Sequence, residues 1–340
     1  MGRQSSSAAR RVVVVVCAAM AVAAAAAQKY NAVYNFGDSI TDTGNLCTNG
    51  RVVVDFLASK FGLPFLPPSK STSADFKKGA NMAITGATAM DANFFRSLGL
   101  SDKIWNNGPI SFQIQWFQQI SSSVCGQNCK SYLANSLFVF GEFGGNDYNA
   151  MLFGGYSADQ ASTYTSQIVD TISNGVEKLI AMGAVDVVVP GVLPIGCFPI
   201  YLTIYGTSSS SDYDSLGCLK KFNDLSTNHN NQLKTKISAL QSKYKSARIM
   251  YADFYSGVYD MVRNPGNYGF STVFETCCGS GGGKFNYNNN ARCGMSGASA
   301  CSNPASHLSW DGIHLTEAAY KQITDGWLNG PYCSPAILHS

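Results

Sequence analysis

Short apolar runs alternate with longer segments of helical periodicity along most of the chain, and this alternation limits the folds open to it. Runs of β-branched and aromatic residues typical of strands occupy residues 32–36, 137–140, 185–189 and 249–252, with a weaker run at 81–84. Helical spacing occurs at residues 52–61, 168–182, 219–244 and 316–328. Strands that alternate with helices predict an α/β fold, in which helices cover a mostly parallel sheet.

Two helix ends can be placed from single residues. Apolar side chains recur every fourth residue from Ile168 to Ile180, and Gly183 follows, as glycine often does after a helix. Thr316 is suited to be the N-cap of the last helix. In folds of this class ligands bind beyond the carboxyl ends of the strands, so functional residues are expected in the segments that follow the strands.

The first 27 residues have the layout of a secretory signal peptide. Three arginines precede an unbroken apolar run over residues 12–27, which ends in small residues suited to cleavage. The run is shorter than the roughly 20 residues of a membrane-spanning helix; an uncleaved anchor is the alternative. We therefore expect residues 28–340 to form the mature protein as a single domain, secreted to the extracellular space or cell wall.

Charge excludes one class of partner. Loss of the N-terminal segment takes three arginines from the 24 Lys and Arg, which leaves 21 basic against 21 acidic side chains. The near-neutral mature chain predicts no nucleic-acid partner. No later stretch resembles a membrane span, so no stable span is expected. The sequence does not indicate an oligomeric state.

Cysteine content points to an oxidising compartment. The chain has 11 cysteines, of which Cys17 lies in the expected signal peptide, and an even number in a secreted protein favours disulfides. Cys125 and Cys129 could close a small loop. Four further cysteines could bind zinc, although the secretory context favours disulfides; these are Cys277, Cys278, Cys293 and Cys301.

A serine follows the first expected strand directly, in the sequence Gly37-Asp38-Ser39. A serine hydroxyl is a weak nucleophile unless a neighbouring base takes its proton. Glycine, aspartate and serine are also common in ordinary turns, so the motif alone is weak. The nucleophile hypothesis for Ser39 therefore requires a base and an acid that orients it.

His314 is the best candidate for that base. Asp311 lies three residues before it, just ahead of the last helix, and on a tight loop its carboxylate can hold one imidazole nitrogen while the other faces Ser39. The same pair can also simply begin a helix. The other histidines fit less well: His229 lies among asparagines, His307 has no acidic residue close before it, and His339 is near the C-terminus.

Acyl transfer also needs donors that stabilise an oxyanion. Asn146 follows the strand at 137–140 within a glycine-rich segment, and Gly86 could offer a backbone N–H where the chain approaches a ligand closely. Each segment is by itself a common loop. The hypothesis of an ester-cleaving site rests on all of them occurring in order, each after an expected strand or before the last helix.

These segments resemble the sequence blocks of the plant GDSL esterase/lipase group within the SGNH hydrolases. The matching stretches are residues 35–45, 79–87, 144–147 and 309–316, with further similarity at 194–197 and 277–279. The resemblance implies that Ser39, Gly86, Asn146 and His314 are the signature residues and that Asp311 orients His314. It also implies a three-layer α/β/α sandwich with a flavodoxin-like, mostly parallel five-stranded sheet.

One connection departs from this family. Members usually carry a longer segment after the first block, and it ends in a motif like Asn49-Gly50-Arg51. Here only residues 46–48 separate that motif from Asn45. The helix expected from residue 52 is preserved. Loops tolerate changes in length better than core elements do, so we expect the triad to be spared and a wall of the cleft to change.

The sequence therefore predicts a secreted serine carboxylic ester hydrolase that acts through an acyl-enzyme, without metal or cofactor. The partner is an ester substrate, which the resemblance places among acylated carbohydrates, metabolites and lipids, with small acyl groups on a plant carbohydrate or metabolite favoured. An acyltransferase with the same site is one alternative. A binding protein impaired by the short connection between Asn45 and Asn49 is the other. The absence of a Gly-x-Ser-x-Gly motif disfavours an α/β-hydrolase.

Overall fold

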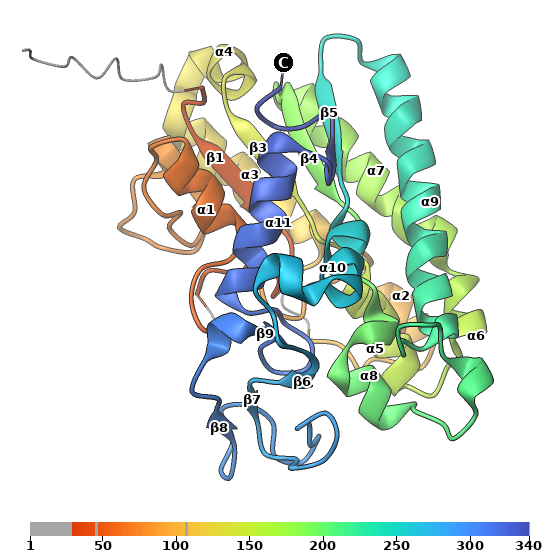
Figure 1. Cartoon of the computed structure of the whole chain (residues 1–340). Helices are drawn as coiled ribbons and strands as arrows, with labels where there is room; N and C mark the ends of the chain where they lie inside the picture. Colours follow the sequence, from red (N-terminus) through yellow and green to blue (C-terminus); the bar gives the residue numbers. More distant parts are fainter. Residues whose placement is uncertain (1–28, 45–46, 106–107, 340) are drawn as a thin grey trace, which may run out of the picture.

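A computed structural model describes residues 29–44, 47–105 and 108–339. The expected signal peptide, 1–27, and residues Asn45 and Leu46 of the short connection lie outside these ranges. Figure 1 shows a central sheet with helices on both sides and several long loops at one end.

Within the described ranges, five parallel strands form the sheet, and a sixth, two-residue strand pairs antiparallel with β5 at one edge. Their order across the sheet is β10-β5-β4-β3-β1-β2. The strands are β1 (Val33–Phe36), β2 (Gly79–Asn81), β3 (Leu137–Phe140), β4 (Asp186–Pro190), β5 (Arg248–Ala252) and β10 (Cys333–Ser334). The parallel part has the flavodoxin-like order expected from the sequence resemblance.

The strands are apolar because both faces of the sheet are covered. Every residue of β1 and β3 is buried, and β4 has four buried residues after the partly exposed Asp186. A parallel sheet buried on both sides needs continuous apolar runs, which is the pattern that marks these strands in the sequence.

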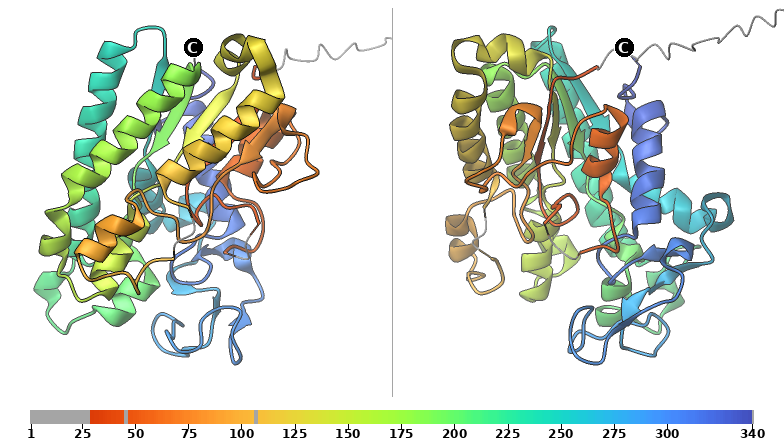
Figure 2. Two further views of the ribbon diagram at one scale, coloured as in Figure 1. Left: turned by 180° about the vertical axis from the view of Figure 1, so that it is seen from behind. Right: turned by 90° about the vertical axis from the view of Figure 1, so that its left-hand side faces the viewer.

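Helices form the outer two layers of an α/β/α sandwich, which the right-hand view of Figure 2 shows edge-on. One layer contains α3 (Ile110–Cys125), α7 (Thr165–Met182) and α9 (Lys220–Lys243), with α7 packed against both others. The opposite layer contains α1 (Val53–Lys60), α10 (Phe254–Arg263) and α11 (Glu317–Asn329), with α11 packed against both others. The expected three-layer architecture is confirmed.

The remaining elements are short and lie mainly in the connections. The helices are α2 (Ala92–Ser97), α4 (Cys129–Ala134), α5 (Gly145–Phe153), α6 (Ala158–Ser162) and α8 (Pro199–Ile204). Two small sheets pair β6 (Thr272–Thr276) with β9 (His307–Ser309), and β7 (Cys278–Gly279) with β8 (Ser299–Ala300). Both small sheets lie at the loop-rich end of the molecule in Figure 1.

Two sequence-based expectations about the sheet need correction. The strand expected at 81–84 is instead Gly79–Asn81, because the Asn81 side chain accepts the Ala83 N–H at 2.9 Å and turns the chain away. The expected five-stranded sheet has a sixth strand, β10, whose two residues are too few to show a periodic pattern. Gly183 does end α7, and the Thr316 side chain caps α11 by accepting the Ala319 N–H.

Four disulfides cross-link the described cysteines, which confirms the disulfide expectation. The bonds join Cys125 to Cys129, Cys197 to Cys218, Cys277 to Cys301, and Cys278 to Cys293. Within the described ranges, Cys47 and Cys333 are free thiols. The alternative zinc site loses its ligands, because all four of its cysteines are paired.

The described ranges hold no helix that is both long and apolar enough to cross a membrane.

Candidate active site

Ser39 lies just beyond the carboxyl end of β1, in a turn that requires glycine. Gly37 has φ +144°, and a Cβ there would lie 2.8 Å from the carbonyl oxygen of Gly141. The buried Gln113 side chain fixes this turn, since it accepts the Gly37 N–H and donates to the Gly37 carbonyl. β1 and β3 are neighbours in the sheet, and the strand order reverses at this pair. The turn lies at the carboxyl end of β1, beside this reversal, which is where α/β folds bind ligands.

Ser39, His314 and Asp311 form a continuous line of hydrogen bonds. The Nε2 atom of His314 is 2.8 Å from the Ser39 Oγ atom, and its Nδ1 atom is 2.6 Å from Asp311 Oδ2. The other carboxylate oxygen of Asp311 accepts the backbone N–H groups of Ile313 and His314, which fixes the carboxylate in place. The structure thus brings together three residues separated by up to 275 positions.

Burial and charge shift the pKa values of His314 and Asp311 in opposite directions. Burial alone would lower the pKa of His314, but the Asp311 carboxylate and its hydrogen bond raise that pKa well above the usual value, with a contribution from the Cys47 thiol. Burial alone would raise the pKa of Asp311, but the charge and hydrogen bonds of His314 hold it below its usual value. The pair therefore favours an imidazolium next to a carboxylate, the state that forms when His314 takes a proton.

The two expected oxyanion donors also lie at this site. Asn146 is in the first turn of α5, and its Nδ2 atom donates to Asp38 Oδ2 at 2.6 Å and to the Ala87 carbonyl at 3.0 Å. The second of these bonds ties Asn146 to the segment that contains Gly86. Among the residues that the structure describes, the backbone N–H groups of Ser39 and Gly86 have no acceptor.

Sequence reasoning missed the buried carboxyl groups behind the site. Burial raises the pKa of Asp38 to about 7, and the Ile40 N–H and the nearby His314 oppose that rise. Burial and the neighbouring Asp38 raise the pKa of Glu142 well above its usual value. Asp147 has a pKa raised to about 7, again through burial. Asp38 stands beside Ser39 in the sequence, but only the fold shows that its carboxyl group is buried.

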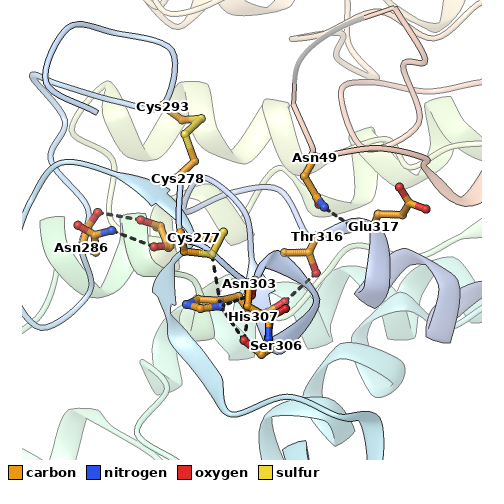
Figure 3. The surroundings of a disulfide bond; sticks show 12 residues. Asn49, Cys277, Cys278, Asn286, Cys293, Asn303, Ser306, His307, Thr316 and Glu317 are labelled. Carbon is orange, nitrogen blue, oxygen red and sulfur yellow. Dashed lines mark hydrogen bonds between the residues drawn. A yellow bond between two sulfur atoms is a disulfide. The ribbon is translucent and has the colours of Figure 1, made fainter. Parts of the chain in front are cut away.

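Disulfide-linked segments brace the loop that contains Asp311 and His314. Cys277 lies between β6 and β7, and Cys278 is the first residue of β7; Figure 3 shows both cysteines. Their backbone N–H groups donate to the carbonyls of Ser309 and Trp310, immediately before Asp311. The neighbouring cysteines thus tie the catalytic loop to two disulfide-closed segments.

The described part of the short connection contacts the same loop from the other side. The Asn49 side chain accepts the Glu317 N–H at 2.8 Å, a contact drawn in Figure 3. Thr48 donates its hydroxyl to the Leu315 carbonyl, and Arg51 forms a two-pronged ion pair with the Glu317 carboxylate. The end of the connection therefore holds the start of α11, which directly follows His314.

A small cavity adjoins Ser39. It measures about 30 Å³, and its lining includes Ser39, Asn146, Leu193, Ile195 and Tyr201. A volume of this size holds about two water-sized groups, and the aliphatic and aromatic walls favour an apolar occupant.

Comparisons with known proteins identify the family of this chain. A family model described as GDSL-like lipase/acylhydrolase matches residues 33–327. A GDSL esterase/lipase from Arabidopsis thaliana is 38% identical to this chain over 343 residues and covers 90% of this chain and 92% of its own. Sinapine esterase from Brassica napus is 37% identical over 344 residues, with 91% and 88% covered.

Among solved structures, a phospholipase A1 from Streptomyces albidoflavus aligns with 12% identity and a TM-score of 0.41 over 86% of this chain and 95% of its own. The family match extends from β1 to α11, the two elements next to Ser39 and His314. The chain belongs to the GDSL lipase/acylhydrolase family, and it is a serine ester hydrolase.

Proposed function

We propose that this chain is a secreted esterase that removes acetyl or similarly small acyl groups from a plant carbohydrate or metabolite, with Ser39 as the nucleophile. The observation that supports this role for Ser39 is its 2.8 Å hydrogen bond to His314, which is itself held by Asp311. A nucleophile, a base and an orienting acid in one line are the components of acyl transfer through an acyl-enzyme.

In the first half of the reaction, Ser39 Oγ attacks the ester carbonyl carbon while its proton moves to His314 Nε2. The carbonyl π electrons move to oxygen and form the tetrahedral oxyanion. The intermediate then collapses, the bond to the alcohol oxygen breaks, and His314 gives its proton to the departing alcohol. The acyl group remains on Ser39.

In the second half, water takes the place of the alcohol. His314 accepts a proton from water, whose oxygen attacks the acyl carbon, and a second tetrahedral intermediate breaks the bond to Ser39 Oγ. The proton on His314 returns to Ser39, and a carboxylic acid leaves. Asp311 keeps the imidazole oriented and stabilises its charged form throughout.

The oxyanion is assigned to the N–H groups of Ser39 and Gly86 and to the Asn146 amide. The two backbone groups have no acceptor among the described residues, which suits them to this role. The Asn146 amide donates to Asp38 and Ala87, so it must exchange one of those bonds for the oxyanion. Such preorganised donors commonly contribute roughly 10²–10³-fold to the rate.

The size of the cavity beside Ser39 supports a small acyl group. At about 30 Å³ it fits an acetyl methyl group, whereas a long acyl chain would require the buried Tyr201 or Leu193 to move. Secretion is proposed from the N-terminal segment 1–27, and the four disulfides are consistent with an oxidising compartment.

The test combines active-site labelling with a substrate screen. A fluorophosphonate probe should label the wild-type protein and the matched control Ser122→Ala, an exposed serine on α3, but not Ser39→Ala. Ser39→Ala should lower kcat by roughly 10⁴-fold without unfolding the protein. The screen compares acetyl, butyryl and long-chain esters with acetylated xylan, and an added acceptor alcohol reveals acyl transfer.

Near-normal turnover by folded Ser39→Ala would exclude Ser39 as the nucleophile. A wild-type protein that binds ester but is not labelled would support the impaired binding protein instead. Preference for long-chain esters would overturn the small-acyl assignment.

A further inference from the structure

Two exposed aromatic side chains stand next to the oxyanion site. Trp105 and Phe112 are 64% and 50% exposed, which is unusual for such large apolar groups. Both line a cavity of about 300 Å³, together with Ile104 and Pro109. Neither aromatic residue takes part in the acyl-transfer steps of Ser39 and His314.

This cavity, here called the Trp105 cavity, reaches the site through Trp105, which lies against Gly86. A Cβ on Gly86 would lie 3.4 Å from the Trp105 Cβ atom and 3.5 Å from its Cγ atom, so the indole side chain covers Gly86. Thr88, which lines the cavity, comes directly after Ala87, the residue whose carbonyl binds Asn146. A substrate held by the oxyanion donors therefore has the Trp105 cavity beside it.

The two cavities can be assigned to different parts of an ester. The one beside Ser39 measures about 30 Å³ against about 300 Å³ for the Trp105 cavity, and the nucleophile itself lines it, so we assign the acyl group to it. The alcohol portion must then lie outside it. The Trp105 cavity offers room for a ring next to Gly86.

Its lining favours a neutral ring with one apolar face. Trp105 and Phe112 supply flat aromatic surfaces, and the exposed Asn93 and Ser111 supply polar groups at the edge. The negative face of an aromatic ring attracts the C–H groups of a sugar ring, while sugar hydroxyls can bind the polar edge. Asp91 also lines the cavity, and its carboxylate accepts the N–H groups of Asn93 and Phe94 at the start of α2, so it adds to the polar edge.

We propose that the Trp105 cavity is the binding site for the alcohol portion of the substrate, and that this portion is a sugar ring stacked on Trp105. The proposal rests on the esterase function proposed above. Of the two substrate classes named there, carbohydrate and metabolite, it selects the carbohydrate. It predicts that Trp105 contributes to binding of sugar esters and not to the chemical step.

The experiment keeps the acyl group constant and changes the alcohol. Four acetates are compared: an acetylated methyl xyloside, benzyl acetate, acetylcholine and ethyl acetate, which has no ring. The variants are Trp105→Ala, Trp105→Phe and Phe112→Ala. Phe65→Ala is the matched control, because Phe65 is 59% exposed and does not line this cavity.

Trp105→Ala should raise KM for the xyloside acetate by roughly tenfold, the loss expected when an aromatic anchor is truncated, with kcat little changed. Trp105→Phe should recover part of the loss. The kcat/KM for ethyl acetate should stay near the wild-type value in all variants. In the Ser39→Ala background, calorimetry should show the same loss of xyloside-acetate affinity without turnover.

Four outcomes would overturn the proposal. If Trp105→Ala lowers kcat/KM equally for the xyloside acetate and for ethyl acetate, Trp105 acts by supporting Gly86. If Trp105→Ala lowers kcat/KM more for acetylcholine than for the xyloside acetate, the cavity binds a cation. If the larger decrease is for benzyl acetate, it binds an aromatic alcohol. Turnover of ethyl acetate without turnover of the xyloside acetate would exclude the sugar. Failure of the proposed function is a separate result, in which no acetate shows turnover that depends on Ser39.

Discussion

The proton on His314 decides the pH range in which Ser39 can attack, because only the neutral imidazole accepts a proton. Its pKa lies above the ordinary value of about 6.5, since Asp311 stabilises the imidazolium. We therefore predict that kcat/KM rises with pH through a midpoint above about 6.5. Asp311→Asn should move the midpoint downward, because burial without the carboxylate lowers the pKa.

Two controls separate His314 from other groups that titrate nearby. His339→Gln should leave the profile unchanged, because this histidine lies outside the site. Asp38 has a pKa of about 7 and titrates in the same pH window. Asp38→Asn therefore tests how much Asp38 contributes to the pH dependence of kcat/KM. A profile that is flat from pH 5 to 8, with chemistry shown to be limiting, would argue against a histidine base.

Local sequence motifs predicted the catalytic residues themselves. They did not predict the residues that surround and support the catalytic ones. Ser39, Asp311 and His314 stood out because each lies at a fixed offset from an expected element. Glu142 and Cys47 did not, because their importance depends on burial and on contacts between distant segments. A single sequence shows an acidic residue or a thiol, but only the fold shows that it lies next to the catalytic histidine or serine.

At the scale of elements, the end of the short connection acts as a cap on α11. Asn49 accepts the Glu317 N–H, so Asn49→Ala should cost about 1 kcal/mol of unfolding free energy, as other N-cap losses do. Since α11 directly follows His314, the same change should also lower kcat. Chemical denaturation and steady-state kinetics measure the two effects.

The matched control is Ser157→Ala, which removes a similar side-chain cap from α6. It should lower stability by a comparable amount and leave kcat unchanged. Equal effects of the two variants on kcat would show that Asn49 contributes only to stability. No effect of Asn49→Ala on either quantity would show that the Asn49–Glu317 contact is unimportant in solution.

Periodicity predicted the long helices and central strands, and it failed where polar groups are buried. Helix α3 escaped notice although Ile110, Ile114 and Phe117 follow helical spacing. Gln113 interrupts its apolar face, because this buried side chain binds the Gly37 turn instead of packing as a hydrophobic group. A buried polar side chain that supports the active site thus weakens the apolar periodicity from which its helix would be predicted.

At the scale of the whole molecule, three of the four described disulfides fall into two groups by their distance from the catalytic loop. Cys125–Cys129 closes a short loop between α3 and α4, at the end of the molecule away from the site. Cys277–Cys301 and Cys278–Cys293 lie in the segments that bind the loop of Asp311 and His314. Stability and activity should therefore respond differently to the loss of different bonds.

We predict that Cys277→Ser with Cys301→Ser lowers both Tm and kcat. This disulfide spans 24 residues, and loops of such length commonly contribute about 3 kcal/mol or more to stability. Its loss also removes one of the two disulfides that anchor the segment whose N–H groups bind the Ser309 and Trp310 carbonyls, so the distance between His314 and Ser39 should fluctuate more. A displacement near 1 Å can cost about 10²-fold in rate.

The matched control is Cys125→Ser with Cys129→Ser, which removes a disulfide of only four residues' separation. It should lower Tm slightly and leave kcat unchanged. Both double variants are compared at a temperature well below either Tm, so that a lower kcat cannot arise from unfolded protein. If the Cys277–Cys301 variant keeps wild-type kcat under those conditions, the disulfide stabilises the fold without positioning His314, and the hydrogen bonds from Asp311 and Asn49 are sufficient to hold the catalytic loop.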